Sequence, residues 1–510
     1  MDKRNLGQVL ASNINHRGDR VAMIEGGANW TYREFGARVF KLAEVFADLG
    51  LAPGDRFAIF AKNSRSFEEL RWAGFVSGIV PVAINWRLAP PEIAHVLKDS
   101  ASAIIFIDAA FAAAFDSPEL SQWQPGLQPL GPELEARIDA ARPAGKPAQI
   151  NAPGPGDDAM LFYTGGTTGR GKGVRLSHWN IISCGLAFGL GVGARADDVY
   201  LHVAPMFHSA DLLATAWFIN GAAHCYLPSF SPAGFLETIA EHRVSVTVTV
   251  PAMLMAVAGG GEVPDAQIAS LRTLIFGAAP MAFEWTERVA AAFPNVDFLN
   301  CYGLTETAPD LTIFEPDAFR AAIASGDRGG IVTSVGKPNV LVDLRIVGAG
   351  GEDVAPGEVG ELWASGPNIM QGYLNLAGET EAALSGGWLH TGDMARIDGD
   401  GYVYLLDRKK DMVISGGENV YSSEVEAALH RHPSVAEAAV IGLADARLGE
   451  ALFAVIVLNE GSDVTEEELI DHCRDLIGGY KIPRRYAFVG ALPKSALGKV
   501  LKADLRNQYS

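Results

Sequence analysis

Residues 163–174 read YTGGTTGRGKGV and follow the apolar run AMLF at 159–162. The glycines let the backbone approach a polyphosphate closely, and the threonines offer hydroxyl donors beside the backbone N–H groups. Lys172 adds a positive charge to the same segment. The pattern predicts a phosphate-binding loop after a buried strand, although a flexible surface loop rich in glycine and threonine has a similar composition.

A nucleotide-binding P-loop is an alternative interpretation of this segment. Gly166, Gly171 and Lys172 satisfy the G-x-x-x-x-G-K pattern, but the next residue is Gly173 instead of the Ser or Thr that binds magnesium in P-loops. The tripeptide VRL then separates the loop from a helix cap that we expect at Ser177. Because the loop does not lead directly into a helix N-terminus, the P-loop interpretation is disfavoured.

Short apolar runs alternate with longer segments of helical character between about residues 56 and 305. RFAIF, AIIFI, VSVTVTV and TLIFG are the clearest of these runs. Runs that are apolar on both faces and alternate with helices predict parallel sheets covered by helices, which is a layered α/β fold. From about residue 325 to residue 406, alternating strands separated by glycines predict a smaller β-rich subdomain.

The basic segment DRKKD at 407–411 is followed by a pattern typical of a compact α+β unit. Two helix starts in this unit are expected to carry capping boxes, Ser423 with Glu426 and Thr465 with Glu468. We therefore expect a large N-terminal domain and a small C-terminal domain. The predicted domains are residues 1–407 and 408–510.

Composition limits the classes of function. A chain of 510 residues with 48% hydrophobic and 20% charged residues is typical of a globular protein with several cores. The net charge of -19 disfavours nonspecific binding to nucleic acid or to anionic lipid. Four widely spaced cysteines and an N-terminus without a signal peptide or membrane span predict a cytoplasmic protein with reduced thiols, without membrane insertion.

Five further segments follow the loop in order: GAAP at 277–280, YGLTET at 302–307, LHTGD at 389–393, LDRKKDMVISGGENVYSSEVE at 406–426 and PKSALGK at 493–499. With them, the chain resembles the adenylate-forming superfamily of acyl-CoA synthetases, luciferases and adenylation domains. The loop of that family usually reads Y-T-S-G-T-T-G-x-P-K-G, and this chain has Gly165 and Gly171 in place of Ser and Pro. The resemblance implies an AMP-forming acid–CoA ligase that uses ATP, Mg²⁺ and coenzyme A. A stand-alone domain that loads a carrier protein, or a luciferase-like oxygenase, remains an alternative.

The resemblance also implies roles for individual residues. Thr305, Glu306 and Lys499 would be catalytic, Glu306 and Thr164 would bind Mg²⁺, and Lys410 would be the hinge of the small domain. A mobile ammonium at Lys499 would stabilise charge that develops during attack on the α-phosphorus. The residues implied for ATP and AMP binding are Thr164, Gly165, Gly166, Thr167, Thr168, Gly169, Lys172, Gly277, Ala278, Ala279, Tyr302, Asp393 and Arg408.

The acid pocket is expected beside the segment APMFH at 204–208. No Arg or Lys occurs between residues 205 and 221, so a second carboxylate on the substrate would lack an ionic partner there. This favours a monocarboxylic aryl acid or a medium- to long-chain aliphatic acid over malonate. Gly416 and Gly417 are implied for the path of CoA, and the residues implied for the acid pocket are His208, Ala210, Ala214, Ala278 and Gly303.

Two expectations concern partners. Pro493, Gly498 and Lys499 form a P-x-x-x-x-G-K pattern that resembles the acetylation signature of bacterial acyl-CoA synthetases, so a lysine acetyltransferase could act on Lys499. Acetylation would remove the charge that the adenylation step needs. The sequence is also compatible with a homodimer.

Overall fold

The computed structural model describes residues 4–141, 153–164, 171–279, 281, 283–326, 330–415, 418–445, 447–474, 476–494 and 499–510. The chain forms two compact units. Unit 1 comprises residues 1–343 and 364–389, and unit 2 comprises residues 344–363 and 390–510. The predicted boundary between residues 407 and 408 stays a prediction. No helix among the described residues is both long and apolar enough to cross a membrane.

Unit 1 contains a nine-stranded sheet in the order β15-β14-β13-β12-β11-β9-β10-β1-β2. The strands from β1 to β13 along this order are parallel neighbours, whereas β2, β14 and β15 pair antiparallel at the two edges. The strands are β1 (Val21–Glu25), β2 (Ala28–Thr31), β9 (Val199–His202), β10 (Ala223–Tyr226), β11 (Val246–Thr249), β12 (Thr273–Gly277), β13 (Asp297–Tyr302), β14 (Thr312–Phe314) and β15 (Lys337–Pro338).

A second, seven-stranded sheet of unit 1 has the order β18-β8-β7-β4-β3-β5-β6. Its central strands are parallel, and β7, β8 and β18 form antiparallel pairs at one edge. The strands are β3 (Arg56–Phe60), β4 (Val80–Ala83), β5 (Ile104–Ile107), β6 (Leu127–Pro129), β7 (Asp158–Thr164), β8 (Lys172–Ser177) and β18 (Gly372–Tyr373). The predicted parallel sheets and the strands RFAIF, AIIFI, VSVTVTV and TLIFG are confirmed.

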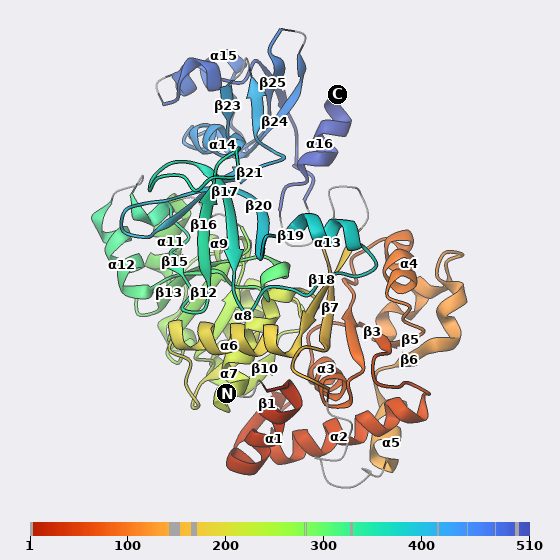
Figure 1. Cartoon of the computed structure of the whole chain (residues 1–510). Helices are drawn as coiled ribbons and strands as arrows, with labels where there is room; N and C mark the ends of the chain where they lie inside the picture. Colours follow the sequence, from red (N-terminus) through yellow and green to blue (C-terminus); the bar gives the residue numbers. More distant parts are fainter. Residues whose placement is uncertain are drawn as a thin grey trace. The chain divides into compact units, whose positions relative to one another are not determined.

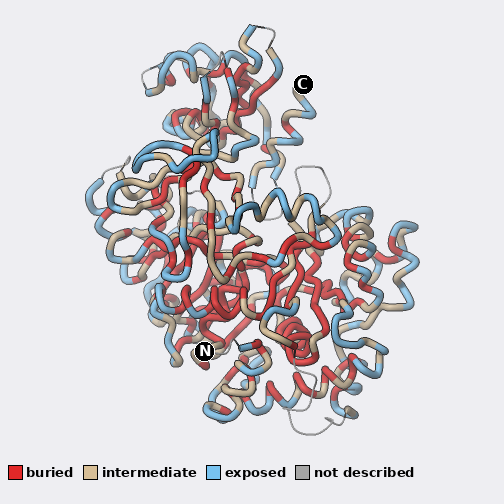
Figure 2. The backbone as a smooth tube through the Cα atoms, in the orientation of Figure 1, coloured by how far each residue is buried: buried red, intermediate tan, exposed pale blue. Residues whose placement is uncertain are grey.

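Helices cover these sheets (Figure 1). The longest, α2, packs against α3, and both contribute aromatic residues to the largest core of unit 1. Figure 2 shows that buried segments are concentrated in the strands and in the helices next to them. The helices of unit 1 are α1 (Leu6–Arg17), α2 (Tyr32–Asp48), α3 (Arg65–Ser77), α4 (Pro90–Asp99), α5 (Pro132–Ala140), α6 (His178–Gly191), α7 (Thr215–Asn220), α8 (Pro232–His242), α9 (Pro251–Gly259), α10 (Asp265–Ile268), α11 (Phe283–Ala292), α12 (Pro316–Ser325) and α13 (Ala377–Ala383).

Unit 2 is α+β. Strands β16 (Asp343–Val347), β17 (Gly360–Ser365), β20 (Trp388–Ile397), β19 (Leu384–Ser385) and β21 (Val403–Arg408) form one sheet. Most of its residues belong to unit 2, whereas β19 falls in the residue range of unit 1. The other sheet has the order β23-β22-β25-β24 with β26 beside β25. Its elements are β22 (Val413–Ser415), β23 (Glu418–Val420), β24 (Val435–Asp445), β25 (Gly449–Leu458) and β26 (Arg485–Phe488), with helices α14 (Ser422–His430), α15 (Glu466–Arg474) and α16 (Lys502–Tyr509).

The two predicted capping boxes of unit 2 have different outcomes. The Thr465–Glu468 pair is confirmed, because Glu468 N donates to Thr465 Oγ1 at 3.2 Å and Thr465 N donates to Glu468 Oε2 at 2.8 Å. The Ser423–Glu426 box is wrong. Ser423 lies inside α14, where its hydroxyl donates to the carbonyl of Leu406, and Glu426 accepts from the backbone of β24 instead. Both side chains therefore form hydrogen bonds to other strands instead of to each other's backbone.

Candidate active site

The predicted phosphate loop connects β7 to β8, and its residues 165–170 lie outside the described part of the chain. Gly165, Gly166, Thr167, Thr168 and Gly169 therefore stay predictions. The ends of the loop are well anchored. Thr164 pairs with Lys172 across the hairpin, and His95 Nε2 of α4 donates to the carbonyl of Gly171 at 2.9 Å. The hairpin thus presents both ends of the loop from a rigid edge of the sheet.

Lys172 has two partners that the sequence did not indicate. Its ammonium forms an ion pair with Glu379 of α13, and it lies 4.9 Å from the ring centroid of Tyr373 in β18. Tyr373 in turn donates its hydroxyl to Glu306 Oε1 at 2.9 Å. The predicted phosphate ligand and the predicted magnesium ligand are therefore joined through one tyrosine.

The other predicted nucleotide residues of unit 1 follow the carboxyl ends of parallel strands. Gly277 ends β12 and Tyr302 ends β13, two neighbouring strands of the nine-stranded sheet. Ligands of α/β sheets bind at this edge. A Cβ on Gly277 would lie 2.4 Å from the carbonyl oxygen of Cys301, so glycine permits the close approach of these strands. Ala278 has a positive φ of 66°, a strained conformation for alanine, and Ala279 follows it, partly buried.

Gly303 continues directly from β13 into the segment of Thr305 and Glu306. A Cβ there would lie 1.8 Å from the carbonyl oxygen of Pro309, so the absent side chain makes room for backbone. Thr305 is buried, and its hydroxyl lies 2.9 Å from that of Ser209. Ser209 thereby connects the predicted catalytic threonine to the predicted acid-binding segment. Sequence reasoning missed this residue, because a serine after His208 carries no signal of its own.

His208 caps a short 3-10 helix, η4 (Ser209–Ala214), which contains both Ala210 and Ala214. The backbone N–H of Ala210 donates to His208 Nδ1 at 3.2 Å, which requires that nitrogen to be unprotonated. Burial lowers the pKa of His208 to about 4. The imidazole is therefore neutral at physiological pH, with Nε2–H as its donor, and it supplies no positive charge to a substrate.

A buried ionic network holds η4 in place. Arg71 of α3 donates to Asp211 Oδ2 at 2.8 Å and also pairs with Glu68. His202 Nδ1 lies 2.5 Å from Asp211 Oδ1, and His202 Nε2 lies 3.0 Å from His224 Nδ1. Ligand atoms of Glu68, His202 and Asp211 lie within 4.8 Å of one another, as in a metal site. Because the guanidinium of Arg71 already pairs with both carboxylates, we interpret this group as a structural network.

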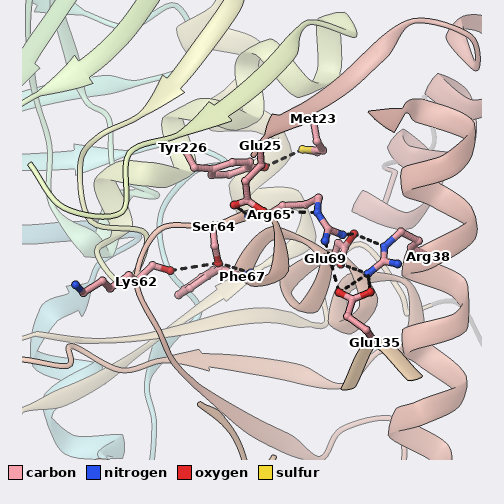
Figure 3. Close-up of polar contacts among 10 residues, drawn as sticks. All are labelled: Met23, Glu25, Arg38, Lys62, Ser64, Arg65, Phe67, Glu69, Glu135 and Tyr226. Carbon is pink, nitrogen blue, oxygen red and sulfur yellow. Dashed lines mark hydrogen bonds and ion pairs between the residues drawn. The ribbon is translucent and has the colours of Figure 1, made fainter. Parts of the chain in front are cut away.

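A second ionic cluster on α3 is also structural. Glu69, which is almost fully buried, accepts from Arg38 of α2 at 2.6 Å and pairs with Arg65 (Figure 3). Glu135 of α5 pairs with Arg38 at 2.8 Å, and Arg65 also pairs with Glu25 at 3.7 Å. The cluster ties three helices and β1 together and contains none of the predicted site residues.

Asp310 is a buried acid for which the predicted mechanism has no role. Its Oδ2 accepts from Asn339 Nδ2 at 2.7 Å, and its Oδ1 has no hydrogen-bond partner among the described residues. Burial raises the pKa of Asp310 to about 8, against a smaller lowering by the Asn339 hydrogen bond. The folded protein therefore keeps a proton that the unfolded chain releases near pH 4.

We expect Asp310→Asn to stabilise the protein at pH 8 and to have little effect at pH 4. Since the unfolded chain binds fewer protons between these values, the stability of the unmodified protein falls as pH rises through this window. The amide resembles the protonated acid and does not ionise. The free energy of unfolding of Asp310→Asn should therefore exceed that of the unmodified protein by about 1–3 kcal/mol at pH 8. Melting curves from pH 4 to pH 8 test this. Asp317→Asn, whose side chain is 98% exposed, is the control, and equal pH profiles for all three proteins would contradict the assignment.

Unit 2 brings together four of its predicted functional residues. Asp393 of β20 and Arg408 of β21 are register partners, and their side chains form an ion pair at 2.7 Å. Lys499 stays accessible to water, yet the surrounding protein removes part of its hydration and lowers its pKa. The charges of Arg408 and Lys410 lower this pKa further, whereas Asp393 and Asp411 raise it. Gly416 and Gly417 lie outside the described residues.

The ligand set of unit 1 fits a hard cation. Glu306 offers a carboxylate, of which Oε1 already accepts the hydroxyl of Tyr373, and Thr164 offers a hydroxyl at the end of β7. Mg²⁺ prefers such oxygen ligands and usually completes its shell with water and substrate phosphates. The donor types are therefore compatible with the predicted metal.

Comparisons with known proteins identify the family of the chain. The model of the AMP-binding enzyme family matches residues 10–374, and that of the AMP-binding enzyme C-terminal domain matches residues 424–499. The chain is 36% identical to feruloyl-CoA synthase of Amycolatopsis sp, over 96% of both chains. It is 32% identical to long-chain-fatty-acid–CoA ligase FadD13 of Mycobacterium tuberculosis, over 99% of both chains.

A solved structure shares the whole fold. The crystal structure of ATP-bound MatB from Rhodopseudomonas palustris superimposes with a TM-score of 0.88 and 28% identity, over 99% of both chains. The resemblance first seen in six short segments thus extends over nearly the full length. The chain belongs to the AMP-binding enzyme family and is an AMP-forming acid–CoA ligase.

Proposed function

We propose that the protein activates a monocarboxylic acid, either aryl or medium- to long-chain aliphatic, as its acyl-AMP and transfers the acyl group to coenzyme A. The observation that carries the choice of acid is the state of His208. Its low pKa leaves it neutral beside a segment, residues 205–221, that contains no Arg or Lys. A second carboxylate would have to lose hydration there without an ionic partner, which is costly.

In the first step, a carboxylate oxygen of the acid attacks the α-phosphorus of ATP, and the bond to pyrophosphate breaks. Thr305 donates its hydroxyl to the α-phosphate, Lys172 attracts the outer phosphates, and Tyr302 stacks on adenine against Gly277, Ala278 and Ala279. Mg²⁺ held by Glu306 and Thr164 would withdraw charge from the phosphate oxygens. No side-chain nucleophile is needed, because positioning and electrostatics supply the rate.

Unit 2 contributes the remaining groups. Asp393 accepts hydrogen bonds from the ribose hydroxyls, and Arg408 contacts ribose or phosphate. Lys499 stabilises the negative charge that builds up in the adenylation step. For thioester formation, the small domain of residues 408–510 turns about Lys410, and the segment of Gly416 and Gly417 lines the path of CoA. Such a change of conformation between half-reactions is a known way to use one site twice.

The function is tested by a panel of acids assayed for AMP release with and without CoA. We expect aryl or medium- to long-chain monocarboxylic acids to release AMP in a CoA-dependent manner, and malonate to be inactive. Release that needs a carrier protein instead of CoA would identify a carrier-loading enzyme. Oxygen uptake or light emission would identify an oxygenase. No acid-dependent exchange of pyrophosphate with any acid would contradict the proposal as a whole.

We also propose that a lysine acetyltransferase regulates the enzyme at Lys499. The lowered pKa of this lysine leaves more of the neutral amine, which is the nucleophile in acetyl transfer. Treatment with an acetyltransferase and acetyl-CoA should modify Lys499 first and stop adenylation. Mass spectrometry measures the sites. Equal modification of exposed lysines such as Lys409 would show that the target is not selective.

A further inference from the structure

A short stretch of unit 1, residues 370–374, connects the two sides of the proposed phosphate site. The backbone N–H of Met370 donates to the carbonyl oxygen of Glu306 at 2.8 Å. The backbone N–H of Leu374 donates to the carbonyl oxygen of Gly173 at 2.7 Å. Within the stretch, β18 pairs antiparallel with β8, so that Tyr373 is the register partner of Val174. We call residues 370–374 the bridging segment. Its backbone alone fixes the distance between the β7–β8 hairpin and the segment of Glu306.

The side chain of Tyr373 repeats this connection with two charged groups. The hydroxyl donates to Glu306 Oε1 at 2.9 Å, and the ring lies 4.9 Å from the ammonium of Lys172. The backbone of Tyr373 is itself held, because its N–H donates to Thr380 Oγ1 at 2.9 Å. Gly372 has a φ of 133°, and a Cβ there would lie 2.5 Å from Thr380 Cγ2. The tyrosine therefore has little freedom to move away from either group.

Glu379 supplies the negative charge that pairs with the ammonium of Lys172. It follows the bridging segment on α13 and forms an ion pair with the ammonium. The side chain of Glu379 is 41% exposed, and an ion pair with an exposed carboxylate contributes little stability. A polyphosphate carries several negative charges and would compete for the same ammonium. The ring of Tyr373 can retain Lys172 while this exchange of partners takes place, because the ring contacts the ammonium from one side only and leaves other N–H groups for the phosphates.

From these contacts we propose that Tyr373 is a positioning residue of the adenylation step. It orients the carboxylate of Glu306 and the ammonium of Lys172 before ATP binds, and Glu379 is the counter-ion that ATP replaces. The inference rests on the roles that the proposed function gives to Glu306 and Lys172. Groups that are already oriented need no reorganisation in the transition state, and this preorganisation increases the rate.

Tyr373→Phe and Glu379→Gln test the two halves of the proposal. Tyr373→Phe removes the hydroxyl and keeps the ring, so we expect kcat for acid-dependent pyrophosphate exchange to fall on the order of tenfold. The Mg²⁺ concentration for half-maximal rate should rise, while KM for ATP changes little. Glu379→Gln removes the competing carboxylate and should lower KM for ATP. Thioester formation from supplied acyl-AMP and the melting temperature should stay unchanged in both variants.

The matched control is Tyr480→Phe, at an exposed tyrosine of unit 2. Failure of the inference is distinguishable from failure of the proposed function. If the unmodified protein exchanges pyrophosphate but Tyr373→Phe keeps its kcat and Mg²⁺ dependence, Tyr373 does not position Glu306. An equal loss in both half-reactions with a lower melting temperature would show a merely structural tyrosine, which also overturns the proposal. Absence of exchange in the unmodified protein would contradict the proposed function itself.

Discussion

Lys499→Ala is expected to lower the rate of acyl-AMP formation on the order of 10²–10³-fold, the range found when one group that stabilises transition-state charge is removed. Thioester formation from supplied acyl-AMP should stay largely intact, because we assign the ammonium to one step only. Pyrophosphate exchange measures the first step, and release of AMP from acyl-AMP with CoA measures the second.

The control for this change is Lys494→Ala, in the same C-terminal segment. Lys494 forms an ion pair with Glu437 at 2.6 Å, and we give it no role in catalysis. Its variant should keep both half-reactions. Equal loss of both steps in a folded Lys499→Ala protein would show that the assigned role is wrong.

The protonation of Lys499 adds a second test of the same role. Its lowered pKa means that the ammonium is lost at a lower pH than for an ordinary lysine. Adenylation should therefore decline on the alkaline side as pH rises through this lowered pKa. The residual activity of Lys499→Ala should not show that decline.

The sequence predicted the layered α/β fold because its signals are local. Buried parallel strands such as RFAIF are apolar on both faces, and the pattern can be seen without knowing which strands pair. Two predicted site residues, Gly277 and Tyr302, end neighbouring strands, and their role in binding stays a prediction. The Thr465–Glu468 cap was equally local and equally predictable.

Contacts between distant parts of the chain could not be predicted in this way. Tyr373 meets the carboxylate of Glu306 across 67 positions, and its own neighbourhood shows no period or motif that would indicate this role. Ser209 reaches Thr305 across 96 positions. For Ser423, the local pattern predicted a helix cap that does not form. Its hydroxyl donates instead to the carbonyl of Leu406 on β21. The tertiary fold determines the hydrogen-bond partners of such side chains.

The largest effect on stability is expected for Arg71→Met. This change leaves the carboxylates of Glu68 and Asp211 buried without their cation, which costs about 3–5 kcal/mol in comparable cases. Denaturant unfolding measures the loss of free energy. The control is Arg33→Met, whose ion pair with Asp19 is exposed and contributes about 0–1 kcal/mol.

A second variant separates the charge of the network from its packing. Combining Arg71→Met with Glu68→Gln and Asp211→Asn removes all three of these charges, so it should recover part of the lost stability. If the single variant is as stable as the unmodified protein, the network is not a buried ion cluster. If the triple variant is less stable than Arg71→Met, the balance of charges does not stabilise the network.

The network should matter for catalysis through η4. Asp211 lies in the same short helix that His208 caps, and Ser209 of that helix contacts Thr305. Asp211→Asn weakens the ionic anchor without leaving Arg71 alone, because Glu68 still pairs with it. We therefore expect a folded protein with a KM for the acid raised severalfold and a smaller change in KM for ATP. An equal rise in both constants would mean that the network supports the unit as a whole and does not position the acid-binding segment in particular.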